Sequence, residues 1–335
     1  MTNQNILSPW VKRFLSEYLI TEKNLSRNTQ QSYRDTFKLC FPFIAKNSKK
    51  EIDKLAFEDI SSELIKKFLL NLELSRGCSV TTRNQRLAAL HAFAKFISLN
   101  CPEYIDWCRQ ISSIPFKKAK SSSITYLEKY EMDALLNSPD LSTEQGRRDH
   151  AILLFLYNTG ARANEIAQLT IADLEISSNL KKHFSIVNIR GKGNKLRRCP
   201  LWDQTVKELR ILVSGREKNE PVFLNRRHYP ITRFGIHNLV KRYVIKLHHK
   251  IPSLAKKQVS PHTIRHTTAT HLLRAGVDIN TIRVWLGHVS INTTNIYAEV
   301  DLEMKAKALA CCEVINKKSK HWRNDKELMK FLNSL

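Results

Sequence analysis

Apolar residues recur at helical spacing along most of the chain. In its first hundred residues they predict four helices, at residues 10–18, 28–45, 61–74 and 81–99. In the fourth, the apolar side chains return every three or four positions, as in a helix that packs one face against a core. The front of the chain therefore predicts a small helical domain.

A proline, several lysines and three serines then interrupt the pattern. The run Ile-Pro-Phe-Lys-Lys-Ala-Lys-Ser-Ser-Ser at residues 114–123 is typical of an exposed connector. We therefore predict a helical domain at 1–113, a basic linker at 114–123, a second domain at 124–316 and a tail helix at 317–335. A basic link would let two domains close around opposite sides of a duplex, although a simple spacer explains it equally well.

Helical spacing returns after the linker, with predicted helices at 126–137, 148–158, 202–214 and 232–248. Between residues 183 and 201 the period changes to two, and Gly191-Lys192-Gly193-Asn194-Lys195 separates the two halves. This pattern predicts a β-hairpin with a basic tip. The expected fold class is mostly α, with a small β-sheet or hairpin in the C-terminal domain.

The stretch from residue 260 to 297 predicts three short helices that carry titratable side chains. A serine followed by a proline opens the first helix, so His262 and Arg265 share its first turn and one face. Backbone N–H groups and the helix dipole favour an anion there. A glycine ends the second helix and leaves His288 free to point back, and Tyr297 lies on the third. The stretch outlines a phosphate site.

Charge points to a polyanionic partner. Lys plus Arg outnumber Asp plus Glu by 55 to 31, a net charge of +24, which favours nucleic acid over an anionic membrane surface. The predicted DNA contacts are Arg83 and Arg86 at the start of the fourth helix, Lys117 and Lys118 in the linker, and Lys195 at the hairpin tip. The start of the chain lacks a signal-peptide pattern and no run is apolar enough to span a membrane, so we expect a cytoplasmic protein.

Several of these signals are weak when each is taken alone. Arg162 follows a helix end at a tight turn, with Glu165 one turn later as an orienting partner, but such pairs are more often surface ion pairs. Basic hairpin tips commonly serve solubility. His262 and His266 are four apart, but no glutamate follows the first and no third ligand is near, which disfavours zinc. We therefore expect no metal.

Taken together and in order, the motifs are specific. They are Thr159-Gly160-Ala161-Arg162 with Glu165, the Gly191–Lys195 turn, His262-x-x-Arg265-His266, Leu286-Gly287-His288 and Tyr297. With them the chain resembles the tyrosine recombinases, also called the phage integrase family, over residues from about 124 to 300. Ile264 stands where that family often has leucine, an apolar exchange that changes nothing in the chemistry.

The resemblance implies a role for each motif residue. Arg162 and Arg265 would bind the phosphate and Tyr297 would be the nucleophile. His262 is our candidate for the base that deprotonates the phenol. Lys192 would protonate the leaving oxygen, while His288 hydrogen-bonds the phosphate or orients the nucleophile.

The implied protein is a two-domain clamp around DNA that cleaves and rejoins strands through a 3′-phosphotyrosyl intermediate without metal or ATP. Four subunits would act on two duplexes with paired inverted half-sites, through a Holliday junction, with or without related recombinases. Xer-type and transposon- or integron-borne members are the better comparison, which suggests a mobile element, and we expect the tail helix to dock on a neighbouring subunit. The open alternatives are an Xer-like resolvase, a type IB topoisomerase and a DNA-binding accessory protein without catalysis.

Overall fold

The computed structural model describes residues 6–119, 124–177, 184–287, 330 and 334, apart from the side chain of Lys192. The chain separates into two compact units, Met1–Ser122 and Ser123–Leu335, and each is described by itself. Both units are mostly helical, and the second also contains a small antiparallel sheet, which confirms the predicted fold class.

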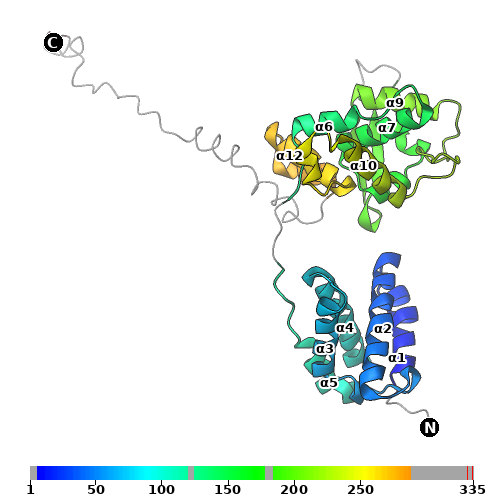
Figure 1. Cartoon of the computed structure of the whole chain (residues 1–335), viewed down its shortest axis with the longest axis vertical. Coiled ribbons are helices and arrows are strands. Elements are labelled where there is room, and N and C mark those ends of the chain that lie inside the picture. The colour runs from blue at the N-terminus through cyan, green and yellow to red at the C-terminus, as the bar shows by residue number, and fades with distance from the viewer. Residues whose placement is uncertain (1–5, 120–123, 178–183, 288–329, 331–333, 335) are drawn as a thin grey trace. The chain divides into compact units, whose positions relative to one another are not determined.

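The first unit is a helical bundle in which α2 and α4 pack side by side (Figure 1). Its elements are α1 (Leu7–Arg13), the π-helix η1 (Phe14–Glu22), α2 (Arg27–Ser48), η2 (Ile52–Lys54), η3 (Phe57–Asp59), α3 (Ser62–Leu74), α4 (Val80–Asn100), η4 (Pro102–Tyr104) and α5 (Ile105–Ser112). Ser26, Ser61 and Ser79 cap α2, α3 and α4 by accepting a backbone N–H. The four helices predicted from spacing are confirmed, and α5 is an addition.

An aromatic cluster fills the core of this unit. Phe14 of η1 lies against Phe93 and Phe96 of α4, with ring centroids 5.2 and 5.4 Å apart, and Phe37 of α2 lies 5.4 Å from Phe93. All four side chains are almost fully buried. Because burying one phenylalanine stabilises a fold by about 1.5–3 kcal/mol, the cluster ties the three helical segments together.

The start of the predicted linker makes contacts within the first unit, although residues 115–119 are exposed as the composition predicts. Ile114 is a core residue with 2% of its surface exposed. Arg83 donates from Nη1 to the carbonyl of Pro115 at 3.0 Å. The amide of Asn84 donates to the carbonyl of Lys117 at 2.7 Å and accepts its N–H at 3.1 Å. Tertiary contacts at the start of α4 thus hold the segment that composition marked as a loose link.

The second unit is mostly helical, with α7, α9, α10 and α12 labelled in Figure 1, and it also contains a three-stranded sheet. Its helices are α6 (Lys129–Leu136), α7 (Glu144–Thr159), α8 (Ala163–Ala167), η5 (Ile171–Asp173), η6 (Lys192–Asn194), α9 (Asp203–Val213), α10 (Arg233–Leu247), α11 (Pro252–Ala255), α12 (Pro261–Arg274) and α13 (Ile279–Leu286). Its strands are β1 (Leu174–Glu175), β2 (Ile186–Arg190) and β3 (Leu196–Pro200), antiparallel in that order. None of the helices in the described ranges is long and apolar enough to cross a membrane.

The predicted hairpin is confirmed as β2 and β3. Val187 pairs with Cys199, and both are buried, as the period of two requires. The strands are joined at η6, where Gly193 adopts a φ of 74°, a conformation that glycine reaches without strain. The two-residue strand β1 is an addition to the prediction.

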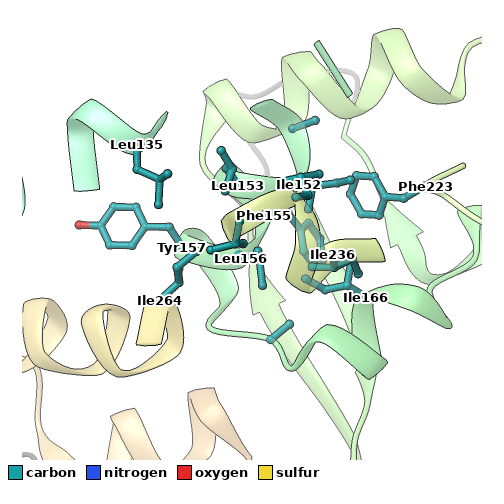
Figure 2. Packing of buried hydrophobic residues seen from close by; sticks show 14 of the residues in the cluster. Leu135, Ile152, Leu153, Phe155, Leu156, Tyr157, Ile166, Phe223, Ile236 and Ile264 are labelled. Atoms are coloured by element: carbon teal, nitrogen blue, oxygen red, sulfur yellow. The ribbon is translucent and has the colours of Figure 1, made fainter. Parts of the chain in front are cut away.

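Helix α7 runs through the core of the second unit. Figure 2 shows its side chains Ile152, Phe155 and Leu156 among buried residues of other elements, with Ile264 of α12 on one side and Phe223 on the other. The ring centroids of Phe155 and Phe223 are 5.7 Å apart. Because α7 is fixed on several sides, its C-terminal end is a firm support for the turn that follows.

Candidate active site

Arg162 projects from a turn that glycine makes possible. Gly160 closes α7 in the left-handed conformation, with φ 59° and ψ 24°, and the chain then enters α8 with Arg162 at its N-cap. The backbone N–H of Arg162 donates to Glu165 Oε2 at 2.9 Å, and its Nη1 donates to Oε1 at 2.7 Å. One carboxylate therefore fixes both the main chain and the guanidinium of Arg162.

The carboxylate of Glu165 is shared with a second arginine. Arg197 of β3 donates from Nη2 to Glu165 Oε2 at 2.6 Å, and both side chains are buried. Burial alone raises the pKa of Glu165, but the hydrogen bond and charge of Arg197, with those of Arg162, lower the pKa below its usual value. Glu165 is therefore an anion that holds two cations in place.

Arg265 joins three segments of the second unit. It lies near the start of α12 and is 1% exposed. Its Nη1 donates to the carbonyl of Gly160 at 2.7 Å, and its Nη2 donates to the carbonyl of Leu286 at 2.6 Å. The α7–α8 turn and the end of α13 are thus held by one guanidinium.

His262 lies in the first turn of the same helix, and part of its surface is exposed. Ser260 caps the helix by accepting the N–H of Thr263, as the sequence predicts. Partial burial lowers the pKa of His262, and the positive charges of Arg265 and Arg162 lower it further. His262 is therefore neutral at neutral pH and able to accept a proton.

These residues line one hollow of about 420 Å³. Arg162 enters it from α8, and His262 and Arg265 enter it from α12. Helix α10 contributes Arg233 and His237, which the sequence pattern did not single out. The structure thus brings three of the six predicted catalytic residues together. Arg162 and Arg265 are 103 positions apart in the sequence (265 minus 162), so the fold and not a local motif brings them together.

The other predicted catalytic residues are only partly described. Lys192 begins η6 at the hairpin turn, and its side chain lies outside the described atoms. His288 follows Gly287, which ends α13 in the left-handed conformation with φ 66°. His288 and Tyr297 themselves lie outside the described residues. Within the described ranges, no three His, Cys, Asp or Glu side chains lie together as a metal site would require.

The predicted DNA contacts have different surroundings. Arg83 is 5% exposed, and its guanidinium donates to the carbonyl of Pro115. Arg86 is half-buried and donates to the carbonyl of Ser32 at 2.9 Å. Lys117 donates to Glu73 at 2.6 Å with half of its side chain exposed, while Lys118 and Lys195 are exposed. The DNA contacts of the two arginines and of these three lysines stay predictions.

Arg197 is the site residue that sequence reasoning missed. It is buried on the same face of β3 as Cys199, while Arg198 points to the other face. A methyl group placed on Gly287 would lie 3.2 Å from Arg197 Cδ, so the arginine also packs against the end of α13. The period-two pattern of β3 is the signal that assigns Arg197 to the inside of the sheet.

Comparison with known proteins gives consistent matches. Residues 125–304 match the model of the phage integrase family, and residues 11–99 match the phage integrase N-terminal SAM-like domain. The chain is 37% identical over 343 residues to a putative integrase/recombinase, y4rC, of Sinorhizobium fredii, with 100% of both chains covered. It is 30% identical over 295 residues to the tyrosine recombinase XerC of Pelobacter propionicus, covering 85% of this chain and 89% of that protein.

A solved structure shares the fold. The Tn1549 transposon integrase, in complex with a circular intermediate DNA, superimposes with a TM-score of 0.66 and 17% sequence identity. The match covers 90% of this chain and 98% of that one. At this identity the likeness concerns the architecture alone.

Proposed function

The chain belongs to the phage integrase family of tyrosine recombinases, and from this premise we propose that it is a site-specific recombinase that cleaves and rejoins DNA strands through a 3′-phosphotyrosyl intermediate. The observation that carries the proposal is the hollow where Arg162, His262 and Arg265 meet. Two fixed cations and a neutral imidazole in one place suit attack on a phosphodiester.

The two arginines stabilise the negative charge that develops on the phosphate oxygens. A phosphodiester under attack carries extra negative charge, and a guanidinium stays protonated and grips two oxygens at once. Glu165 and the carbonyls of Gly160 and Leu286 hold the two guanidiniums before substrate arrives. By analogy with oxyanion contacts, each such donor lowers the barrier by about 3 kcal/mol.

The proton transfers follow from the ionisation states. A free phenol has a pKa of about 10, so the attack of Tyr297 needs a base, and neutral His262 accepts the proton. The phenolic oxygen bonds to phosphorus while the bond to the 5′ oxygen breaks. Lys192 protonates that leaving oxygen, and His288 hydrogen-bonds the phosphate or orients Tyr297.

The phosphotyrosyl bond keeps the energy of the broken phosphodiester. A 5′ hydroxyl from a second duplex reverses the step, so the reaction uses neither metal nor ATP. We further propose four subunits on two duplexes with inverted half-sites, in which the tail helix docks on a neighbouring subunit, with or without related recombinases. The similarity to a putative integrase/recombinase supports an origin in a mobile element, acting on DNA in the bacterial cytoplasm.

The test is covalent capture. The protein is incubated with a nicked duplex made from the DNA that flanks its gene, and a denaturation-resistant adduct is expected that Tyr297→Phe abolishes. In Arg162→Gln, Glu165 still has Arg197 as an ion-pair partner. This variant is expected to form the adduct about 100-fold more slowly while it still binds the duplex. Duplex binding without any adduct would overturn the proposal and favour a non-catalytic DNA-binding protein.

A further inference from the structure

We propose that Arg197 is a positioning residue, which holds Glu165, and through it Arg162, in register with the hairpin turn and with the end of α13. The inference rests on the proposed function for its activity readout. It concerns a residue that is buried and is not among those that line the hollow of Arg162, His262 and Arg265.

Three segments meet at the guanidinium of Arg197. Its Nη2 donates to Glu165 Oε2 at 2.6 Å, and the other oxygen of that carboxylate accepts from Arg162 Nη1 at 2.7 Å. A methyl group on Gly191 would lie 3.5 Å from Arg197 Nη1, and one on Gly287 would lie 3.4 Å from the same atom. The guanidinium thus packs directly between the residues that precede Lys192 and His288.

The absence of a side chain at Gly287 lets the arginine pack closely against the end of α13, while Gly191 lies at ordinary contact distance on the hairpin side. Gly191 begins the turn that carries Lys192, and Gly287 is followed directly by His288. Arg162 lies on the third segment. The Arg197–Glu165 pair therefore contacts the three segments on which Arg162, Lys192 and His288 follow in the sequence. Nε of Arg197 is buried and has no hydrogen-bond partner among the described residues, so packing, the ion pair with Glu165 and the neighbouring Cys199 thiol fix this side chain.

A buried ion pair of this kind is sensitive to loss of one partner. Removing the charge of Arg197 leaves Arg162 as the arginine paired with the buried Glu165. Burial raises the pKa of Glu165, and less positive charge then opposes that rise. The other groups around Glu165 are Cys199 on β3, and Asp173 and Arg190, which line a cavity of about 220 Å³ with it. Arg233 and His237 of α10 face Arg162 from the other side. Without Arg197, the pKa of Glu165 should rise.

The test compares Arg197→Met with Arg198→Met. Both variants remove one positive charge from β3, but Arg198 is exposed and pairs with the exposed Glu175. Adduct formation on the flanking-DNA duplex is measured in single turnover at saturating protein between about pH 8 and about pH 5.5. Arg197→Met is expected to be about tenfold slower than the wild type at the upper end, as for other residues that orient a site, and slower still at the lower end. Arg198→Met is expected to match the wild type.

Two further variants separate positioning from general damage. The double variant Arg197→Met with Glu165→Gln has no buried carboxylate to protonate, so its rate relative to Glu165→Gln should not change with pH. Where Arg197→Met shows no cooperative thermal unfolding, Arg197→Lys takes its place. Lysine keeps the charge but not the planar fork that packs between the glycines, and a rate about five- to tenfold below the wild type is expected.

A DNA-free measurement keeps the inference separate from the proposed function. Carbon-13 NMR of the labelled glutamate carboxyls, with Glu165 assigned by Glu165→Gln, is expected to show a higher Glu165 pKa in Arg197→Met than in the wild type. If the wild type forms no adduct, the proposed function fails and this titration still decides the role of Arg197. An unchanged Glu165 pKa, or an Arg197→Met rate equal to that of Arg198→Met at every pH, would overturn the inference.

Discussion

Gly160 ends α7 and begins the turn that leads to Arg162. Gly160→Ala is the most informative single change in that turn. The residue has a φ of 59°, and its carbonyl accepts a hydrogen bond from Arg265. An added methyl group would lie 2.5 Å from Cδ2 of Leu286, a fully buried side chain. The substitution therefore introduces backbone strain and a steric overlap at the same point.

The two effects have separate magnitudes. A left-handed conformation costs an alanine about 1–2 kcal/mol. Forcing an extra methyl group into a packed core costs about 1–3 kcal/mol more, so we expect Gly160→Ala to lower the free energy of unfolding by about 2–5 kcal/mol. Gly276 has a φ of 85° and no described atom within 4 Å of an added methyl group, so Gly276→Ala should cost only the first term.

Urea unfolding of the two variants measures the difference. The Leu286→Ala background, which removes the overlapping methyl groups, should reduce the cost of Gly160→Ala by about 1–3 kcal/mol. Adduct formation should fall with Gly160→Ala because the carbonyl that holds Arg265 is displaced. If Gly160→Ala costs no more than Gly276→Ala in the wild-type background, the steric reasoning is refuted.

Three other changes test the second unit. Tyr157 hydrogen-bonds Nδ1 of His271 at 2.7 Å, so Tyr157→Phe should lower the free energy of unfolding by about 1 kcal/mol in urea titrations. Asp149 is fully buried and pairs with Arg242, so Asp149→Ala should cost about 3–5 kcal/mol, and a cost near zero would contradict this. Burial and nearby positive charge lower the pKa of His266 to about 4. The unfolded chain then binds the proton more tightly, so stability should fall from about pH 6.5 to about pH 4, and His266→Gln should flatten that slope.

Local patterns predicted the elements that carry the site. The serine and proline before His262 placed it and Arg265 on the first turn of a helix, and α12 begins there. The alternation around residue 190 predicted β2 and β3, since a strand with one buried face must alternate. The grouping of Arg162 with these residues followed from the resemblance, because helical spacing alone does not bring distant turns together.

What the sequence did not reveal depends on contacts between distant segments. Two adjacent arginines in β3 look alike in composition, and although the alternation separates their faces, only the fold shows that Glu165 is the partner of Arg197. Ile114 looked like the start of a linker because a proline and lysines follow it, but its side chain enters the core of the first unit. Arg83 looked like a phosphate ligand because it is basic and near a helix start, yet it holds Pro115.

Identifying the amino acid that is joined to DNA tests the central claim most directly. The adduct formed on the flanking-DNA duplex is digested with nuclease and protease, and the modified peptide is sequenced by mass spectrometry. The proposed mechanism predicts a nucleotide attached through its 3′ phosphate to Tyr297, and no such peptide from Tyr297→Phe. A 5′ linkage, or a nucleotide on any residue other than Tyr297, would contradict it.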